Sequence, residues 1–268
     1  MDKSQKFDLS MYKPEEFKNP GKYTIVNQSY DTTIEIVGGV NSTLRFELGP
    51  LSTANVDEYT GIKLFNNTPN PAQVTVITRE QSSMQQALTG KLFCIDAGHG
   101  GNDPGAVNGT HNEKDTALKI ALRLAAMLEE AGASVLLTRD DDTYPSITER
   151  ANMANNANCT AFISIHLNSA ENKSATGYEI LVYDHNSSSL ANTLAKNVET
   201  FMSSAVSWPD RGIKSRPDLG VLKLTKMPAI LVEVGFISND AESKALQMEQ
   251  TQLSIAMAIY DGIKVTYA

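Results

Sequence analysis

Residues 91–268 contain short apolar runs that alternate with longer amphipathic stretches. The apolar runs have the length and content of buried strands, and they lie at residues 92–95, 135–138, 161–165, 178–182 and 230–234. The intervening stretches repeat their apolar residues every three or four positions, which is typical of helices. Alternating strands and helices predict an α/β domain with a largely parallel, twisted sheet flanked by helices.

The longest helix is predicted over residues 113–131, with Asn112 as its N-cap and Gly132 as its C-terminal stop. Five apolar residues of this stretch share one helical face: Leu118, Ala121, Leu122, Ala125 and Leu128. Two further apolar stripes, at residues 190–201 and 246–263, predict helices later in the chain.

Residues 22–79 have a different pattern, in which β-rich runs recur about every ten residues. These runs lie at residues 23–27, 33–37, 43–48, 62–65 and 73–78. Short strands at this spacing indicate a small sandwich or barrel. The sequence therefore predicts a small all-β domain over residues 1–80, a polar linker over 81–90, and the α/β domain over 91–268.

Composition and charge exclude several classes of protein. Hydrophobic residues make up 41% and charged residues 20% of the chain, which is typical of a globular protein rather than a disordered one. The net charge of −8 is unsuited to a general nucleic-acid binder. No run approaches the ~18 apolar residues of a membrane span. The first twenty residues lack the apolar segment of a signal peptide, so we expect a protein without that export signal, or a sequence given without its leader.

Four side chains of the α/β part are candidates for chemistry. His99 follows the first predicted strand, His166 ends the third, Glu233 lies near the end of the last, and Glu113 begins the long helix. Parallel sheets place their ligands outside the carboxyl ends of the strands. Two imidazoles and a carboxylate form the three-ligand set of catalytic zinc sites, and a second carboxylate then serves as general base.

Each candidate also has a structural interpretation. An imidazole such as that of His166 at a strand end is often only hydrogen-bonded, and Glu113 in a first helical turn gains ~0.3–1 kcal/mol from the helix dipole. A carboxylate inside an apolar strand costs several kcal/mol unless it is paired. The structural alternative for Glu233 is therefore a salt bridge to Arg139 or Arg150.

The remaining histidines and the cysteines are weaker candidates. His111 and His185 lie in polar, loop-like segments and are expected to be exposed, although His111 is close enough to Glu113 to compete as a ligand. Cys94 and Cys159 lie in or beside predicted strands. We interpret both as small core residues rather than nucleophiles.

Several motifs of the α/β part, taken in order, are recognisable. They are IDAGHGGNDPGA at 95–106, NEKD at 112–115, LTR at 137–139 with RAN at 150–152, FISIHLNS at 162–169, RGIK at 211–214 and TKMPAILVEVGFISN at 225–239. Over about residues 91–265 this series resembles the zinc-dependent N-acetylmuramoyl-L-alanine amidases of the amidase-3 type. A chance match to all of the motifs in order is improbable, so the resemblance is specific.

The resemblance implies an enzyme with a phosphorylase/hydrolase-like α/β fold that cleaves bacterial peptidoglycan between N-acetylmuramic acid and the L-alanine of the stem peptide. It implies that His99, Glu113 and His166 bind one zinc ion per catalytic domain. It implies that Glu233 acts as general acid and base on the zinc-activated water.

The resemblance also implies substrate contacts for Asn168, Lys214 and Leu222. Asn168 and Lys214 lie within the matched motifs, and Leu222 ends the loop at residues 215–222, which we expect to face the substrate. This loop departs from the family pattern by carrying a proline and a glycine. The preference among stem peptides is therefore left open.

Two other functions remain as alternatives: a zinc peptidase or carboxypeptidase that acts on stem peptides, and a non-catalytic cell-wall-binding protein. In every case the expected partner is peptidoglycan at the bacterial cell wall. Nucleic acid is not expected as a partner. The N-terminal domain is expected to bind the wall or to form a homo-oligomer. Without a leader, a wall hydrolase fits a phage or prophage endolysin released through a pore, or a bacterial autolysin.

Overall fold

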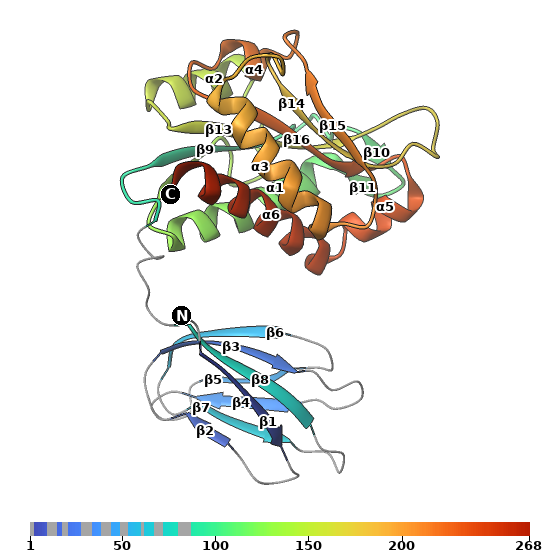
Figure 1. Cartoon of the computed structure of the whole chain (residues 1–268). Helices are drawn as coiled ribbons and strands as arrows, with labels where there is room; N and C mark the ends of the chain where they lie inside the picture. The colour runs from blue at the N-terminus through green and yellow to red at the C-terminus, as the bar shows by residue number, and fades with distance from the viewer. Residues whose placement is uncertain are drawn as a thin grey trace. The chain divides into compact units, whose positions relative to one another are not determined.

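The structure is a computed structural model that describes the eight strands of the first 80 residues and all of residues 87–268 (Figure 1). It divides the chain into two compact units, Met1–Met84 and Gln85–Ala268. Of the predicted linker, residues 81–86 lie outside the described part. Leu88 is fully buried in the core of the second unit, and its backbone N–H donates to the carbonyl oxygen of Ala131 after the first long helix.

The first unit consists of two four-stranded antiparallel sheets. One has the order β1-β8-β3-β6, with β1 at Lys3–Leu9, β8 at Ala72–Arg79, β3 at Gly21–Asn27 and β6 at Thr53–Tyr59. The other has the order β2-β7-β4-β5, with β2 at Glu15–Phe17, β7 at Ile62–Asn66, β4 at Ile34–Gly38 and β5 at Leu44–Leu48. Ile36 and Leu64 are direct partners across β4 and β7, and both are fully buried. One face of this sheet is therefore covered.

The second unit is built on a six-stranded sheet with the order β12-β9-β13-β16-β14-β15. The strands are β12 Ser134–Leu137, β9 Leu92–Ala97, β13 Ala161–Asn168, β16 Ala229–Phe236, β14 Tyr178–Val182 and β15 Asp210–Ser215. The first four are parallel; β14 runs antiparallel to β16 and parallel to β15. This confirms the predicted largely parallel sheet.

Helices cover both faces of this sheet. Successive strand residues point to opposite faces, so Phe93 and Ile95 enter one core while Cys94 enters another. The larger core lies under α1 (Glu113–Glu130), α3 (Leu190–Ala205) and α6 (Glu249–Tyr267), which run together in Figure 1. The smaller core lies under α2 (Ile147–Asn156) and α4 (Gly220–Leu224). The unit thus has three layers, which confirms the predicted α/β class.

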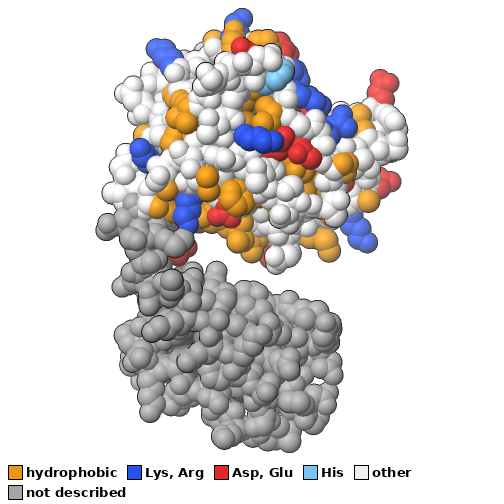
Figure 2. Space-filling view, viewed as in Figure 1, with side chains coloured by type: hydrophobic (Ala, Val, Ile, Leu, Met, Phe, Trp, Pro, Cys, Tyr) orange, Lys and Arg blue, Asp and Glu red, His pale blue; other side chains and the backbone are white. Residues whose placement is uncertain are grey.

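The helices follow the sequence pattern with small differences. The helix predicted over residues 113–131 is α1; its capping residue Asn112 makes no side-chain cap and instead donates to Asp115. The predicted stripe at 246–263 is divided between α5 (Asp240–Leu246) and α6. Among the described helices, none is both long and apolar enough to cross a membrane. On the face that Figure 2 presents, acidic and basic side chains of the second unit are interspersed.

Candidate active site and metal centre

The candidate residues gather at the carboxyl ends of β9, β13 and β16. His99 follows β9 by two residues, and His166 lies in β13 directly opposite Glu233 of β16. Glu113 is the first residue of α1, and the short hairpin of β10 (Val107–Asn108) and β11 (His111–Asn112) leads into it. All four residues therefore lie at the carboxyl ends of the parallel strands, where the sequence predicted the ligands.

Glycines permit the close approach of the two histidines. His99 adopts a left-handed backbone with φ of 60°, which is uncommon for a residue with a Cβ. A Cβ on Gly98 would lie within 2.7 Å of three ring atoms of His166, and one on Gly105 would lie 2.7 Å from both Glu113 and the His99 ring. Larger side chains at these positions would therefore displace the imidazoles and the carboxylate.

A buried ion pair supports the loop that contains His99. The Arg150 guanidinium donates to Asp96 Oδ1 at 2.7 Å and to the carbonyl oxygen of His99 at 2.6 Å. Asp96 also accepts hydrogen bonds from the hydroxyls of Thr138 and Ser164, both at 2.6 Å. Burial raises the pKa of Asp96, but the Arg150 charge and the two hydroxyls outweigh it and hold the pKa below its usual value. The carboxylate is therefore ionised and fully paired.

Arg139 also supports this loop, so neither predicted arginine partner of Glu233 is available to it. Arg139 donates to the carbonyl oxygens of Ala97 at 2.9 Å and Gly98 at 2.7 Å. Both arginines that were alternative salt-bridge partners of Glu233 are thus engaged with the strand end and loop at 96–99. The salt-bridge interpretation of Glu233 is therefore wrong.

Glu113 lies between the two imidazoles. Its Oε1 is 2.9 Å from His166 Nδ1 and 3.1 Å from His99 Nε2, and the histidine rings meet edge to face with centroids 4.8 Å apart. One ligand atom from each of the three residues lies within 4.8 Å of the others. Two nitrogens and one oxygen at this spacing suit a metal ion of the zinc type.

Further hydrogen bonds orient the three side chains. The backbone N–H groups of Leu167 and Ala106 donate to the two carboxylate oxygens of Glu113, each at 2.9 Å. His99 Nδ1 lies 2.8 Å from Asp103 Oδ2, which leaves its Nε2 directed at Glu113. A carboxylate on the far nitrogen of a histidine is the usual way in which proteins orient a metal ligand.

The electrostatics of the group favour a cation. Burial lowers the pKa of His99, but Glu113 and Asp103 outweigh it and raise the pKa to about 9. Burial likewise opposes the rise in the pKa of His166, which Glu113 produces. For Glu113, burial raises the pKa, but the two histidines hold it well below its usual range. The carboxylates of Glu113 and Asp103 thus stabilise positive charge at this point, and a divalent ion would supply that charge in place of protons on the histidines.

Glu233 stands beside this group in a different state. Its Oε2 is buried and makes no hydrogen bond to any described residue. Burial raises its pKa to about 7, although the neighbouring His166 charge opposes the rise. A carboxyl group with this pKa can accept and return a proton near neutral pH.

Of the three predicted substrate contacts, the structure brings two together. Asn168, at the end of β13, and Lys214, in β15, both bond to Glu179 of β14, which lies directly opposite Glu233. Leu222 of α4 is 4% exposed and packs in the core beneath α2 and α4. The structure does not bring Leu222 to the metal group.

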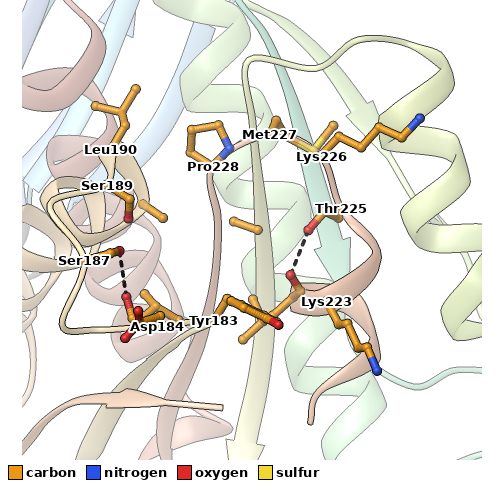
Figure 3. A pocket seen from close by; sticks show the side chains of 14 residues that line it. Tyr183, Asp184, Ser187, Ser189, Leu190, Lys223, Thr225, Lys226, Met227 and Pro228 are labelled. Atoms are coloured by element: carbon orange, nitrogen blue, oxygen red, sulfur yellow. Dashed lines mark hydrogen bonds between the residues drawn. The ribbon is translucent and has the colours of Figure 1, made fainter. Parts of the chain in front are cut away.

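A cavity of 430 Å³ lies at the opposite end of the strands, where β16 begins (Figure 3). Its wall includes Ala229, the first residue of β16, and Val182, the last residue of the antiparallel β14. Leu222, Lys223 and Thr225 complete one side of it. Ala229 and Glu233 are four positions apart in β16, which corresponds to about 13 Å. This cavity is therefore distinct from the metal group.

Of the weaker candidates, His111 differs from the sequence expectation, whereas the two cysteines do not. His111, expected to be exposed, is 5% exposed and bonds through both ring nitrogens, to Ser243 at 2.8 Å and Thr116 at 2.7 Å. It supports the fold and does not join the metal group. Cys94 and Cys159 are buried together, as expected of core residues, and burial raises the pKa of both thiols.

Comparison with known proteins relates residues 93–265 to the family described as N-acetylmuramoyl-L-alanine amidase. The chain is similar to N-acetylmuramoyl-L-alanine amidase LytC of Bacillus subtilis (strain 168), with 32% identity over 199 residues, 74% of this chain and 39% of LytC. It is similar to the probable cell wall amidase LytH of Staphylococcus aureus, with 34% identity over 195 residues, 72% of this chain and 64% of LytH. The chain thus spans less than two thirds of either relative.

The fold is also similar to that of solved N-acetylmuramoyl-L-alanine amidases. The crystal structure of N-acetylmuramoyl-L-alanine amidase from Clostridium difficile 630 is 37% identical to this chain, with a TM-score of 0.62. The match covers 65% of this chain and 94% of that one. The similarity therefore concerns one domain of this chain and nearly all of the solved protein.

Proposed function

Because the chain belongs to the N-acetylmuramoyl-L-alanine amidase family, matched over residues 93–265, we propose that it hydrolyses bacterial peptidoglycan. The bond cleaved is the amide between N-acetylmuramic acid and the L-alanine of the stem peptide. The observation that supports this most directly is the convergence of His99, Glu113 and His166, with Glu233 beside them. Four separate segments of the chain supply these side chains to the carboxyl ends of the parallel strands.

We propose zinc as the cofactor, one ion per catalytic domain, held by His99, Glu113 and His166. Two imidazole nitrogens and one carboxylate oxygen are a usual donor set of catalytic zinc, which leaves a further position for water. The raised pKa values of both histidines support the fit, because they reflect the same attraction for positive charge. When bound, zinc supplies a Lewis acid and a water molecule of lowered pKa.

Glu233 moves the proton in this mechanism. Its Oε2 accepts a proton from the attacking water, since no described residue competes for that atom. The same oxygen then donates the proton to the departing amine of L-alanine. Its pKa of about 7 before metal and substrate bind suits both steps. Asp103 orients the His99 ring, and Arg150 holds the carbonyl oxygen of His99.

Mass spectrometry of digested peptidoglycan tests the proposal. Purified sacculi are incubated with the full chain, with added zinc and with EDTA. We expect free stem peptides that begin with L-alanine, and their absence under EDTA. Shortened stem peptides still attached to muramic acid would contradict the amidase and indicate a zinc peptidase. Binding to sacculi without any product would indicate a cell-wall-binding protein.

A substitution separates the two proposed roles. Glu233→Gln keeps the size of the side chain and removes the basic oxygen, so zinc content is expected to be unchanged while turnover is lost. Retained turnover would contradict the proton-transfer role. Zinc content, measured by elemental analysis of the purified variant, is the control for an intact metal site.

We propose that residues 1–80 bind the cell wall, because wall hydrolases are often paired with such a module. Self-association is the alternative, and a sedimentation measurement of the full chain separates the two. Removal of residues 1–84, the first compact unit, is expected to weaken binding to intact walls while soluble fragments are still cleaved. Unchanged wall binding would contradict this role. The phage-lysin setting stays a prediction from the sequence.

A further inference from the structure

A β-bulge in β15 brings the side chains of Arg211 and Lys214 to the carboxylate of Glu179. Between β14 and β15 the register runs from Tyr178 opposite Asp210 to Ile180 opposite Ile213, so β15 contains one extra residue at this point. Residues three apart in a regular strand point to opposite faces, but a bulge re-aims them. As a result Arg211 and Lys214 both reach Glu179 of β14.

These residues, with Asn168, form what we call the Glu179 cluster. Arg211 Nε donates to Glu179 Oε2 at 3.0 Å, Lys214 Nζ donates to the same oxygen, and Asn168 Nδ2 donates to Oε1 at 2.9 Å. Burial raises the pKa of Glu179, but Lys214 and Arg211 outweigh it and hold the pKa below its usual value. One ionised carboxylate and two cations leave a net charge of +1.

The surplus positive charge faces solvent. The side chain of Glu179 is 11% exposed, whereas that of Lys214 is 42% exposed and that of Arg211 is 37% exposed. Arg211 is further held by the carbonyl oxygen of Thr176 and by the ring of Phe236. Lys214 has three N–H donors, and within the described residues it uses one, on Glu179. Its ammonium group is the freer donor of the two.

The cluster lies in line with the metal group. His166, Glu233 and Glu179 are direct partners across β13, β16 and β14, so their side chains share one face of the sheet. Two strand spacings, about 10 Å, separate His166 from Glu179. An extended peptide advances about 3.3–3.6 Å per residue. An extended peptide that runs from the metal group across these strands therefore brings the third residue beyond the cleaved bond to the cluster.

The chemistry of the substrate identifies what would bind there. In peptidoglycan the lactyl carboxyl group of muramic acid is consumed in the scissile amide, so nearby carboxylates belong to the stem peptide. We propose that the Glu179 cluster is a carboxylate-binding subsite for the stem peptide, in which Lys214 contacts the substrate and Glu179 positions Lys214. This proposal rests on the proposed amidase function.

The test compares two soluble muramoyl tripeptides, one with free carboxylates in the stem peptide and one with these groups amidated. Lys214→Gln in the full chain is expected to raise KM for the free form about tenfold, as loss of one charge-assisted hydrogen bond would. kcat for that substrate and both constants for the amidated form should change less than twofold. Lys214→Arg, which keeps the charge, is expected to restore most of the preference for the free form.

Lys223→Gln is the matched control, because Lys223 is an exposed lysine beside the cavity at the opposite end of the strands. Equal effects of Lys214→Gln on both substrates, or no effect on either, would overturn the subsite while the amidase function stands. If the unmodified protein with zinc cleaves neither tripeptide nor sacculi, the proposed function itself fails. The two failures are therefore distinguishable.

Discussion

Asp96 and Arg150 form a buried ion pair under the His99 loop, and its loss should have a measurable cost. Their side chains are 1% and 4% exposed, with 2.7 Å between Oδ1 and Nη1. Asp96→Asn keeps the shape of the side chain but leaves the Arg150 guanidinium buried without a counter-charge. Breaking a buried pair in this way costs about 3–5 kcal/mol.

The surroundings of Arg150 place the expected value within that range. The guanidinium keeps its hydrogen bonds to the carbonyl oxygens of Pro145, Ala97 and His99, so the lower end applies, about 3 kcal/mol. For a unit of 150–250 residues, each kcal/mol lowers Tm by about 2–4 °C, so the expected decrease is about 6–12 °C.

Trp208 offers a direct assay. It is the chain's one tryptophan and donates to the carbonyl oxygen of Val234 at 2.9 Å, so its fluorescence reports on the second unit. Urea unfolding of Asp96→Asn is compared with Asp140→Asn, the same chemical change at an exposed carboxylate. A loss of less than about 1 kcal/mol, the usual range of an exposed pair, would refute the assigned role of the buried pair.

The same pair predicts a dependence on pH. Because the pKa of Asp96 is lowered in the folded state, its contribution to stability is fully present above the unfolded pKa of about 3.9. The contribution is lost as pH falls through the lower folded value. The difference in unfolding free energy between the unmodified protein and Asp96→Asn should therefore shrink in strongly acidic buffer. A difference that grows on acidification would contradict the direction of the shift.

Three further predictions concern single positions. Glu113→Gln is expected to lower zinc affinity at least tenfold by titration calorimetry, since one anionic ligand is lost; unchanged affinity would return Glu113 to a helix-dipole role. Gly98→Ala is expected to abolish most turnover by displacing the His166 ring, whereas Gly109→Ala, where a Cβ meets no atom within 4 Å and only the left-handed backbone (φ 62°) is strained, should retain turnover. Leu222→Ala is expected to cost about 2–5 kcal/mol of stability and to leave KM unchanged; a raised KM at unchanged stability would instead support its predicted substrate contact.

The sequence pattern predicts the second unit well because its strands are buried on both faces. The runs at 92–95 and 161–165 are apolar throughout and correspond to β9 and β13. The edge strand β15 was missed, because DRGIKS has little apolar content and is a strand through its pairing with β14. In the first unit β1, β2 and β6 were missed for a similar reason, since their sequences are largely polar.

The sequence named the members of the candidate site, but it gave no information on their contacts. The strand-end positions of His99, His166 and Glu233 indicated chemistry, and the family motif indicated Glu113. Asn168 and Lys214 lie in the matched motifs, but their meeting at Glu179 had no sequence signal, because neither a bulge nor a pairing register can be inferred from one chain's hydrophobic pattern.

By itself the sequence determined the α/β class of the second unit, the β-rich character of the first, and the four residues in which chemistry was to be sought. These follow from local periodicity and from the amidase motifs. Only the tertiary structure decided which charges pair. It joined Asp96 to Arg150 across 54 positions and Glu113 to His166 across 53, and within the described residues it left Glu233 Oε2 without a hydrogen bond. Such pairings depend on the order of the strands in the sheet, whereas a hydrophobic pattern records only which face of each element is buried.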